Sequence, residues 1–170
     1  CVEIQSDNEI VSNRNALIKA IQNSYKNWQW SDDEETKQIE ASRSITLIKS
    51  DMFLNLYDNG SCELALEVFE DVYDAYFEEL ILVEAGRKGS NLKRSYSFFD
   101  NDDPFFEPVE AALCAIELGR DDDAEKFLDL SARSLSHMSA YITPVKIGLF
   151  ESTKLIYELQ NTSLEKSISA

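Results

Sequence analysis

Apolar residues recur at every third or fourth position along most of the chain, which is the spacing of one face of an α-helix. No segment alternates apolar and polar residues over enough positions to predict a strand. The pattern instead predicts six helices joined mostly by short turns. They run from about Ser12 to Trp30, Ser31 to Tyr57, Ser61 to Ala85, Pro104 or Pro108 to Leu118, Asp121 to Leu135, and Thr143 to Leu159.

Polar residues and glycines mark the ends of these helices. Residues 31–34 (Ser-Asp-Asp-Glu) have the pattern of a capping box, in which the serine hydroxyl accepts from a backbone amide and the glutamate reaches back. We expect Ser61 and Asp121 to cap the third and fifth helices. Residues 58–60 (Asp-Asn-Gly) and Gly119 are typical of helix C-termini.

The size and composition of the chain fit one globular domain. Of the 170 residues, 44% are apolar and 28% are charged, and no apolar run approaches the roughly 20 residues of a membrane span. Short turns make successive helices antiparallel. We therefore predict an all-α fold over residues 1–170, a single-domain bundle or short array of about six antiparallel helices. The ends, 1–11 and 161–170, are expected to be flexible.

Charge is the property that departs most from the average. The chain has 32 acidic and 16 basic residues and a net charge of −16. Such a field opposes binding to the phosphates of nucleic acids and to anionic membranes, and it favours a basic protein partner. Solubility, or adaptation to salt, is the alternative explanation.

The third predicted helix carries much of this charge on one face. Between Lys49 and Arg87 there are ten acidic residues and no basic one. Six of them follow spacings of three and four and form what we call the acidic stripe: Glu63, Glu67, Glu70, Asp71, Asp74 and Glu78. The apolar seam of the same helix is expected to consist of Leu64, Val68, Val72, Tyr76 and Leu80.

The acidic stripe works against the stability of its own helix. Like charges at this spacing repel by about 0.2–0.5 kcal/mol per pair, and an ordinary solvated face alternates Glu with Lys instead. A surface kept for a binding partner explains this cost. Two alternatives remain: the acids pair with bases of neighbouring helices, or they only keep the protein soluble. The bases expected to fold back onto the stripe are Arg87, Lys88, Lys93 and Arg94.

Two further acidic groups come directly before predicted helices, at residues 100–103 (Asp-Asn-Asp-Asp) and 121–123 (Asp-Asp-Asp). Neither has the alternating ligands, central glycine and final glutamate of a calcium loop. Carboxylates at a helix start accept amide hydrogen bonds and suit the helix dipole, so we predict caps and no metal site. Asp100, Asp102 and Asp103 are expected to extend the partner-binding surface.

Catalysis has little support in the sequence. His137 is the single histidine, so no Ser-His-Asp or Cys-His set can be argued, and no glycine-rich phosphate loop is present. We predict a protein without enzymatic activity, catalytic residues or cofactor. Trp28 fits the apolar face of the first helix, whereas Trp30 is expected to be partly exposed, where an aromatic side chain can anchor an interface.

The three cysteines bear on the cellular compartment. Cys1, Cys62 and Cys114 have neither the number of a disulfide scaffold nor the spacing of a zinc site. Cys62 and Cys114 can pair in an oxidising compartment, but we expect two buried free thiols in a cytoplasmic protein. Cys1 at the first position is typical of a bacterial lipoprotein, which would be anchored to a membrane through it; a trimmed chain is the alternative.

Residues 45–130 resemble the all-helical immunity proteins that bacteria make against polymorphic toxins, in particular the PoNi type. The resemblance lies in Tyr57 to Gly60 (Tyr-Asp-Asn-Gly), which enters a Leu/Val/Phe-rich acidic helix. It lies also in the helical hairpin from Pro108 to Leu130, with Leu-Gly-Arg at its turn, residues 118–120. It implies a protein that binds a cognate, usually basic, nuclease toxin and blocks its active site.

The charge and the resemblance lead to the same hypothesis. A nuclease presents cations to phosphate, so an anionic surface can occupy the same groove. We expect a cytoplasmic immunity protein that binds and neutralises a basic, nuclease-type toxin domain through the acidic stripe, without contacting nucleic acid or membrane. The alternative is a periplasmic helical lipoprotein that serves as an adaptor or assembly module.

Overall fold

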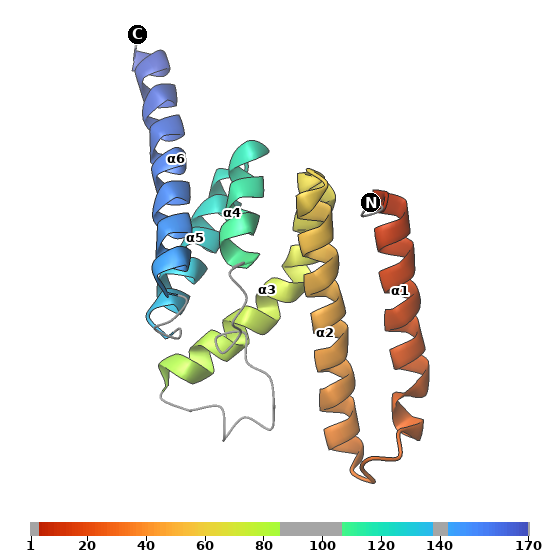
Figure 1. Ribbon diagram of the computed structural model, residues 1–170. Coiled ribbons are helices and arrows are strands. Elements are labelled where there is room, and N and C mark those ends of the chain that lie inside the picture. The colour runs from red at the N-terminus through yellow and green to blue at the C-terminus, as the bar shows by residue number, and fades with distance from the viewer. Residues whose placement is uncertain (1–3, 86–106, 138–142, 170) are drawn as a thin grey trace. The chain divides into compact units, whose positions relative to one another are not determined.

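The structure is a computed structural model that describes residues 4–85, 107–137 and 143–169. All regular structure in these ranges is helical and comprises six α-helices and one 3-10 turn (Figure 1). The all-α prediction is therefore confirmed. The chain divides into two compact units, residues 1–97 and 98–170, which are described separately. The expectation of a single domain over 1–170 stays a prediction.

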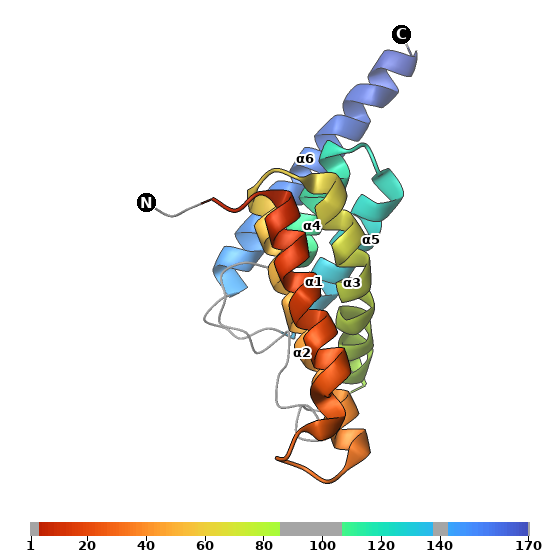
Figure 2. The ribbon, with the colours of Figure 1, turned by 90° about the vertical axis from the view of Figure 1, so that its right-hand side faces the viewer.

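The first unit consists of three long helices and the 3-10 turn. They are α1 (Asp7–Ser24), η1 (Tyr25–Asn27), α2 (Glu34–Asp58) and α3 (Cys62–Glu84). Helices α1 and α2 lie side by side and antiparallel (Figures 1 and 2), and α2 also packs extensively on α3. Helix α2 is therefore the central element of this unit.

Aromatic and aliphatic side chains fill the contact between α2 and α3. Phe53 and Leu56 of α2 and Phe69 of α3 are fully buried. The rings of Phe53 and Phe69 lie 5.0 Å apart between centroids, in a tilted arrangement. Such a pair adds about 0.5–1.5 kcal/mol to the stabilisation that comes from burying its area. The strongest packing in this unit thus holds α3 against α2.

The capping of α1 and α2 at their N-termini differs from the sequence-based prediction. The capping box lies before α1, where the amide of Glu9 donates to Ser6 Oγ at 3.3 Å and the amide of Ser6 donates to Glu9 Oε2 at 3.0 Å. The box expected at residues 31–34 is wrong: Asp33 caps α2, and its Oδ1 accepts from the amide of Glu35 at 3.2 Å. The hydroxyl of Ser31 accepts from the amide of Asp33 instead, because the chain turns before the helix begins.

Glycine ends α2 as predicted. Gly60 has φ +75°, a left-handed conformation that only glycine adopts without strain. Its amide donates to the carbonyl of Tyr57 at 2.9 Å, and the amide of Ser61 donates to the carbonyl of Leu56 at 2.9 Å. This is a Schellman motif, which satisfies carbonyls at the end of the helix and turns the chain sharply into α3.

The second unit contains α4 (Glu107–Glu117), α5 (Asp121–Leu135) and α6 (Thr143–Ser169), which pack on one another. Gly119, with φ +69°, ends α4 through the same Schellman motif and confirms the predicted turn at residues 118–120. Arg120, not Asp121, is the N-cap of α5 and makes no side-chain cap. Residues 121–123 occupy the first turn, where their charge suits the helix dipole.

The helices also reach further toward the chain ends than the periodicity indicates. Helix α1 begins at Asp7, five residues before the predicted start, and ends at Ser24 rather than Trp30. Helix α6 continues to Ser169.

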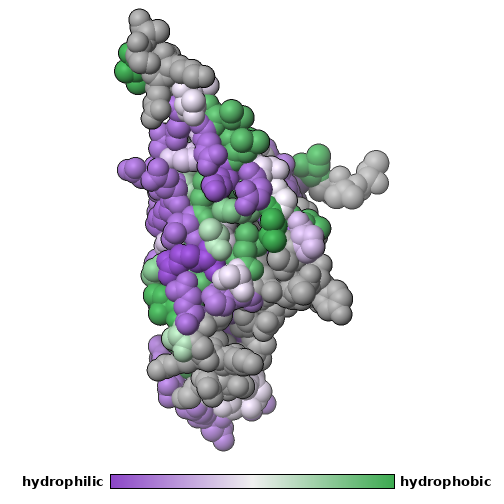
Figure 3. Space-filling view, turned by 90° about the vertical axis from the view of Figure 1, so that its left-hand side faces the viewer, coloured by the Kyte–Doolittle hydropathy of each residue, from purple (hydrophilic) through white to green (hydrophobic). Residues whose placement is uncertain are grey.

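Figure 3, viewed from the side of α6, shows apolar surface among polar surface. The exposed large apolar side chains of this helix are Val145, Ile147, Leu155, Ile156, Leu159 and Ile168.

Candidate partner-binding site

The acidic stripe is a continuous exposed surface. All six of its residues are exposed, and at 3.6 residues per turn they fall within an arc of about 100° on α3. The buried residues of the same helix occupy the other side: Cys62, Ala65, Leu66, Phe69, Val72, Tyr76, Glu79 and Leu80. The predicted separation of an acidic face from a packed face is therefore confirmed.

The apolar seam predicted for α3 is only partly correct. Val72, Tyr76 and Leu80 are buried, but Leu64 is 39% exposed and Val68 is half-buried. Residues spaced strictly by four are displaced by about 40° around the helix axis at every step, because four residues are slightly more than one turn. The first two residues of the predicted seam, Leu64 and Val68, therefore lie outside the packed face. Phe69 takes their place in the core. Leu64 and Val68 consequently lie beside the acidic stripe and give its edge an apolar character.

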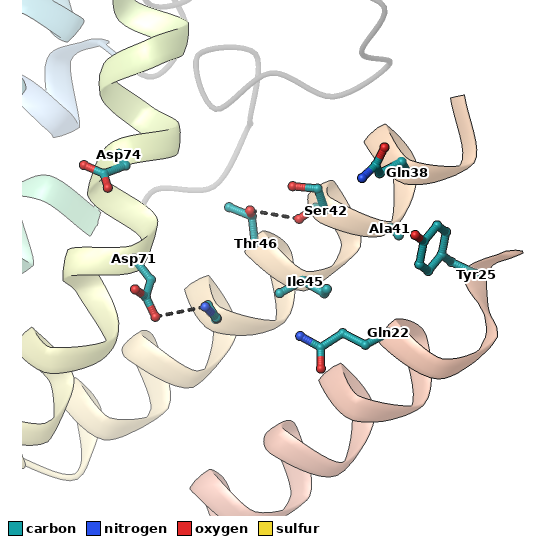
Figure 4. Close-up of a pocket in the computed structure, with 10 residues that line it drawn as sticks. Gln22, Tyr25, Gln38, Ala41, Ser42, Ile45, Thr46, Asp71 and Asp74 are labelled. Atoms are coloured by element: carbon teal, nitrogen blue, oxygen red, sulfur yellow. Dashed lines mark hydrogen bonds and ion pairs between the residues drawn. The ribbon is translucent and has the colours of Figure 1, made fainter. Parts of the chain in front are cut away.

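A groove runs along α2 between α1 and α3. Its larger hollow has a volume of about 420 Å³, with Gln22 and Tyr25 on the α1 side and Asp71 and Asp74 on the α3 side (Figure 4). Helix α2 supplies its remaining lining: Gln38, Ala41, Ser42, Ile45, Thr46 and Lys49.

A second hollow of about 150 Å³ continues the groove. It shares Lys49 and Asp71 with the larger one, so the two adjoin. Its other lining residues are Val11 and Asn15 of α1, Met52 and Leu56 of α2, and Leu64, Glu67 and Val68 of α3. We call the two hollows together the α2 groove. Three stripe residues, Glu67, Asp71 and Asp74, form its acidic wall.

One stripe residue is already neutralised within the protein. The ammonium of Lys49, on α2, lies 2.9 Å from Asp71 Oδ2, and a dashed line from Asp71 marks this ion pair in Figure 4. Both residues line both hollows, so the pair stands where the hollows meet. For Asp71 the alternative explanation, pairing with a neighbouring helix, is therefore correct. Within the described ranges, Glu63, Glu67, Glu70 and Asp74 have no such ion pair with a Lys or Arg.

Several predicted contributors lie outside the described residues. These are the bases at 87, 88, 93 and 94 and the acidic residues Asp100, Asp102 and Asp103.

Of the two tryptophans, Trp28 is half-buried and Trp30 is 56% exposed, and their rings lie 6.1 Å apart between centroids. The expected exposure of Trp30 is confirmed.

A polar clamp, which the sequence did not reveal, fixes one end of the groove. The side-chain amide of Asn59 donates to Asp7 Oδ1 at 3.1 Å and to the carbonyl of Gln5 at 2.9 Å, and Ser61 Oγ donates to Asp7 Oδ2 at 2.5 Å. These bonds, that of Ser61 foremost, lower the pKa of Asp7 below its usual value of 3.8. Arg14 also pairs with Asp51 at 3.0 Å.

The clamp changes the meaning of two sequence features. Ser61 was expected to cap α3 with its side chain, and Asn59 belongs to the Tyr-Asp-Asn-Gly motif of the resemblance. In the structure both side chains bind Asp7 and so attach the start of α1 to the α2–α3 corner. In the sequence, Ser6 with Glu9 three residues later has the spacing of a capping box, which marks the start of α1 at Asp7 but does not indicate the partners of Asp7.

The cysteines contradict the expectation of free thiols. Cys62, the first residue of α3, and Cys114, within α4, are both buried, and both are disulfide-bonded. The sequence left the oxidation state of these thiols open because thiol spacing along the chain says nothing of spatial distance. In the described part of the chain, no three His, Cys, Asp or Glu side chains lie together as a metal site would require.

Comparison with known proteins adds no assignment. No protein-family profile matches the chain, and neither the curated proteins nor the solved structures contain a match. In addition, none of the described helices combines the length and apolar character needed to cross a membrane. The functional argument rests on the residues of the chain itself.

Proposed function

We propose that the protein binds a basic protein partner through the acidic stripe and neutralises it, as an immunity protein neutralises a nuclease-type toxin. The observation that carries this proposal is that Glu67 and Asp74 of the stripe remain exposed beside a groove without an ion pair to a described cation. Acidic side chains that serve only the fold are satisfied within it, as Asp7 and Asp51 are. Glu67 and Asp74 have no such contact within residues 4–85, 107–137 and 143–169, and they line the groove.

The dimensions of the stripe fit the surface of a nuclease. From Glu63 to Glu78 it spans about 22 Å along α3. One strand of a nucleic acid carries about six or seven phosphates over that length. The stripe without Asp71, which Lys49 neutralises, therefore presents a somewhat smaller number of negative charges to a surface that has evolved to bind phosphates. Binding of this kind also covers the site that would receive the nucleic acid.

The electrostatic proposal is tested with two charge-reversed double variants. E67K/D74K reverses two groove-lining acids that have no ion pair among the described residues. E151K/E158K reverses two exposed acids of α6, and each variant changes the net charge from −16 to −12. Asp71 is left unchanged because its reversal would also break the ion pair with Lys49.

The probe is the protein encoded by the gene adjacent to that of this chain, which the proposal expects to be a basic toxin domain. Its binding is measured by calorimetry, and its inhibition is measured as protection of nucleic acid from cleavage. We expect E67K/D74K to weaken binding and inhibition at least tenfold, because it replaces two attractions with two repulsions at the interface. E151K/E158K should bind as the wild type does. Equal affinity of both variants, or no binding of the domain by the wild type, would refute the proposal.

A second candidate is favoured by the cysteines. Disulfide bonds persist in oxidising compartments, whereas a nuclease inhibitor has to act where nucleic acid is, in the reducing cytoplasm. The disulfide-bonded Cys62 and Cys114 therefore favour a periplasmic adaptor or assembly protein that uses the same acidic surface for a basic partner.

Native cells are quenched with acid and their protein is alkylated with iodoacetamide in denaturant, which exposes both buried positions; mass spectrometry then separates the two candidates. An adaptor of the periplasm leaves Cys62 and Cys114 unlabelled until a reductant is added. A cytoplasmic inhibitor is labelled at both without it. The intact mass of the native protein shows in the same experiment whether Cys1 carries lipid.

A further inference from the structure

The α2 groove offers more than negative charge. Along its floor, Ala41, Ile45, Met52 and Leu56 belong to a row of α2 residues at spacings of three and four, so they face the same way. Ile45 is partly exposed there, whereas Ala41, Met52 and Leu56 are buried and form the base of the hollows. Leu64 and Val68 add apolar surface from the α3 wall. A partner that met only the carboxylates would leave the partly exposed Ile45, Leu64 and Val68 unused.

The two walls of the groove differ in charge. The α3 wall carries Glu67, Asp71 and Asp74, whereas α1 contributes Val11, Asn15 and Gln22, none of them charged. A ligand lying lengthwise in the groove therefore meets anions along one flank and uncharged side chains along the other. Beneath it, α2 presents apolar side chains interspersed with Gln38, Ser42, Thr46 and Lys49. This asymmetry fixes the ligand's rotation about its own long axis.

We propose that the α2 groove receives one amphipathic helix of the basic partner, with its Lys and Arg residues toward α3 and its apolar side chains toward α2. This inference rests on the proposed function and names the part of the partner that is bound. The row from Gln38 to Leu56 is about 27 Å long, which is the length of a helix of about 18 residues. The match of walls and floor to one amphipathic helix is the mode in which helices bind grooves.

The hollows fit apolar anchors of two sizes. A cavity of about 150 Å³ accepts one benzene ring, so the smaller hollow suits a single Phe or Leu side chain. The larger hollow, of about 420 Å³, has room for a bulkier anchor or for two. The partner helix should therefore carry a large apolar residue near one end and a smaller one near the other.

Lys49 occupies the position that a cation of the partner would take. Its ammonium lies 2.9 Å from Asp71 Oδ2, between the two hollows, and so demonstrates that this wall holds a cation. It also repels any second cation nearby. Lys49→Met keeps an unbranched apolar stem, removes the repulsion and exposes Asp71 to the partner. We expect binding of a basic helix to become about two- to fivefold tighter, the size of one exposed charge pair.

The test uses a fluorescently labelled synthetic peptide of 18 residues with Lys on one face of a helix and Leu on the other. Its affinity for the full chain is measured by fluorescence anisotropy. Ser42→Trp places a ring over the larger hollow from an exposed position of α2, and Gln38→Trp does so from another exposed position if the first variant does not fold. The matched control is Asn13→Trp, on an exposed part of α1 that does not line the groove.

The expected result is a loss of affinity of at least tenfold for Ser42→Trp, no change for Asn13→Trp, and a gain for Lys49→Met. A peptide with Ser in place of Leu should bind at least tenfold more weakly to the wild type. If E67K/D74K weakens toxin binding while the tryptophan variants and the Leu-to-Ser peptide have no effect, the groove inference is overturned and the acidic-surface function stands. If E67K/D74K also has no effect, both are overturned.

Discussion

Phe69 provides the most direct test of the packing that places the acidic stripe. The sequence pattern put Leu64 and Val68 in the apolar seam of α3, whereas the structure buries Phe69 completely and leaves Leu64 39% exposed. The two descriptions predict opposite rankings for truncation of Phe69 and Leu64 to alanine.

The magnitude follows from burial. A buried aromatic side chain removes about 150–250 Å² from water, which at about 25 cal/mol per Å² is worth roughly 4–6 kcal/mol. Alanine keeps part of that area, but the cavity that it leaves costs stability, and the ring contact with Phe53 at 5.0 Å is lost. We expect Phe69→Ala to lower the free energy of unfolding by about 3–5 kcal/mol. Leu64→Ala should cost at most about 1 kcal/mol, because much of the side chain is already in water.

The free energy of unfolding is measured by urea titration of the two variants and the wild type, followed by far-ultraviolet circular dichroism. A loss of several kcal/mol is a large fraction of the stability of a small domain, so Phe69→Ala should unfold at a clearly lower urea concentration. A larger loss for Leu64→Ala than for Phe69→Ala would show that the seam follows the sequence pattern, and that α3 presents a different face to solvent.

Three further predictions concern the clamp, the second unit and a turn. The bond from Ser61 lowers the pKa of Asp7 below 3.8, so the clamp's contribution to the free energy of unfolding is fully present above pH 3.8 and is lost as the pH falls through the pKa of Asp7 in the folded protein. Asp7→Asn should therefore destabilise the protein at pH 6 and progressively less toward pH 2.5, as measured by urea titration. Tyr157 donates to Glu125 Oε1 at 2.7 Å, and this bond raises the pKa of Tyr157 above 10.0. The free energy of unfolding should therefore fall more steeply above pH 10 in the wild type than in Tyr157→Phe, and parallel pH dependences of the two proteins would argue against this bond. Gly60→Ala should cost about 1 kcal/mol in thermal unfolding, because φ is +75° while the added Cβ meets nothing within 4 Å, and an unchanged midpoint would show that the turn relaxes.

The candidate site divides into parts that local patterns predict and parts that they do not. The exposure of the acidic stripe was predictable, because spacings of three and four place six acids on one side of any helix. The groove beside it was not, since its floor and walls come from three helices. The ion pair between Lys49 and Asp71 joins residues 22 positions apart, and the hydrogen bond between Ser61 and Asp7 joins residues 54 apart. No periodicity carries information at those separations.

By itself, the sequence determined that this protein is all-α, that α2 and α4 end at glycines, and that one face of α3 is anionic. Each of these depends on interactions within a few residues: backbone hydrogen bonds, side-chain spacing, and the freedom of glycine at positive φ. Only the tertiary structure decided that Phe69 rather than Leu64 enters the core, that Asp71 is neutralised while Asp74 has no ion pair among the described residues, and that a groove lies beside the acids. The physical reason is that burial and ion pairing depend on which helix surfaces meet, and that choice minimises the exposed apolar area of several helices together rather than of any one alone.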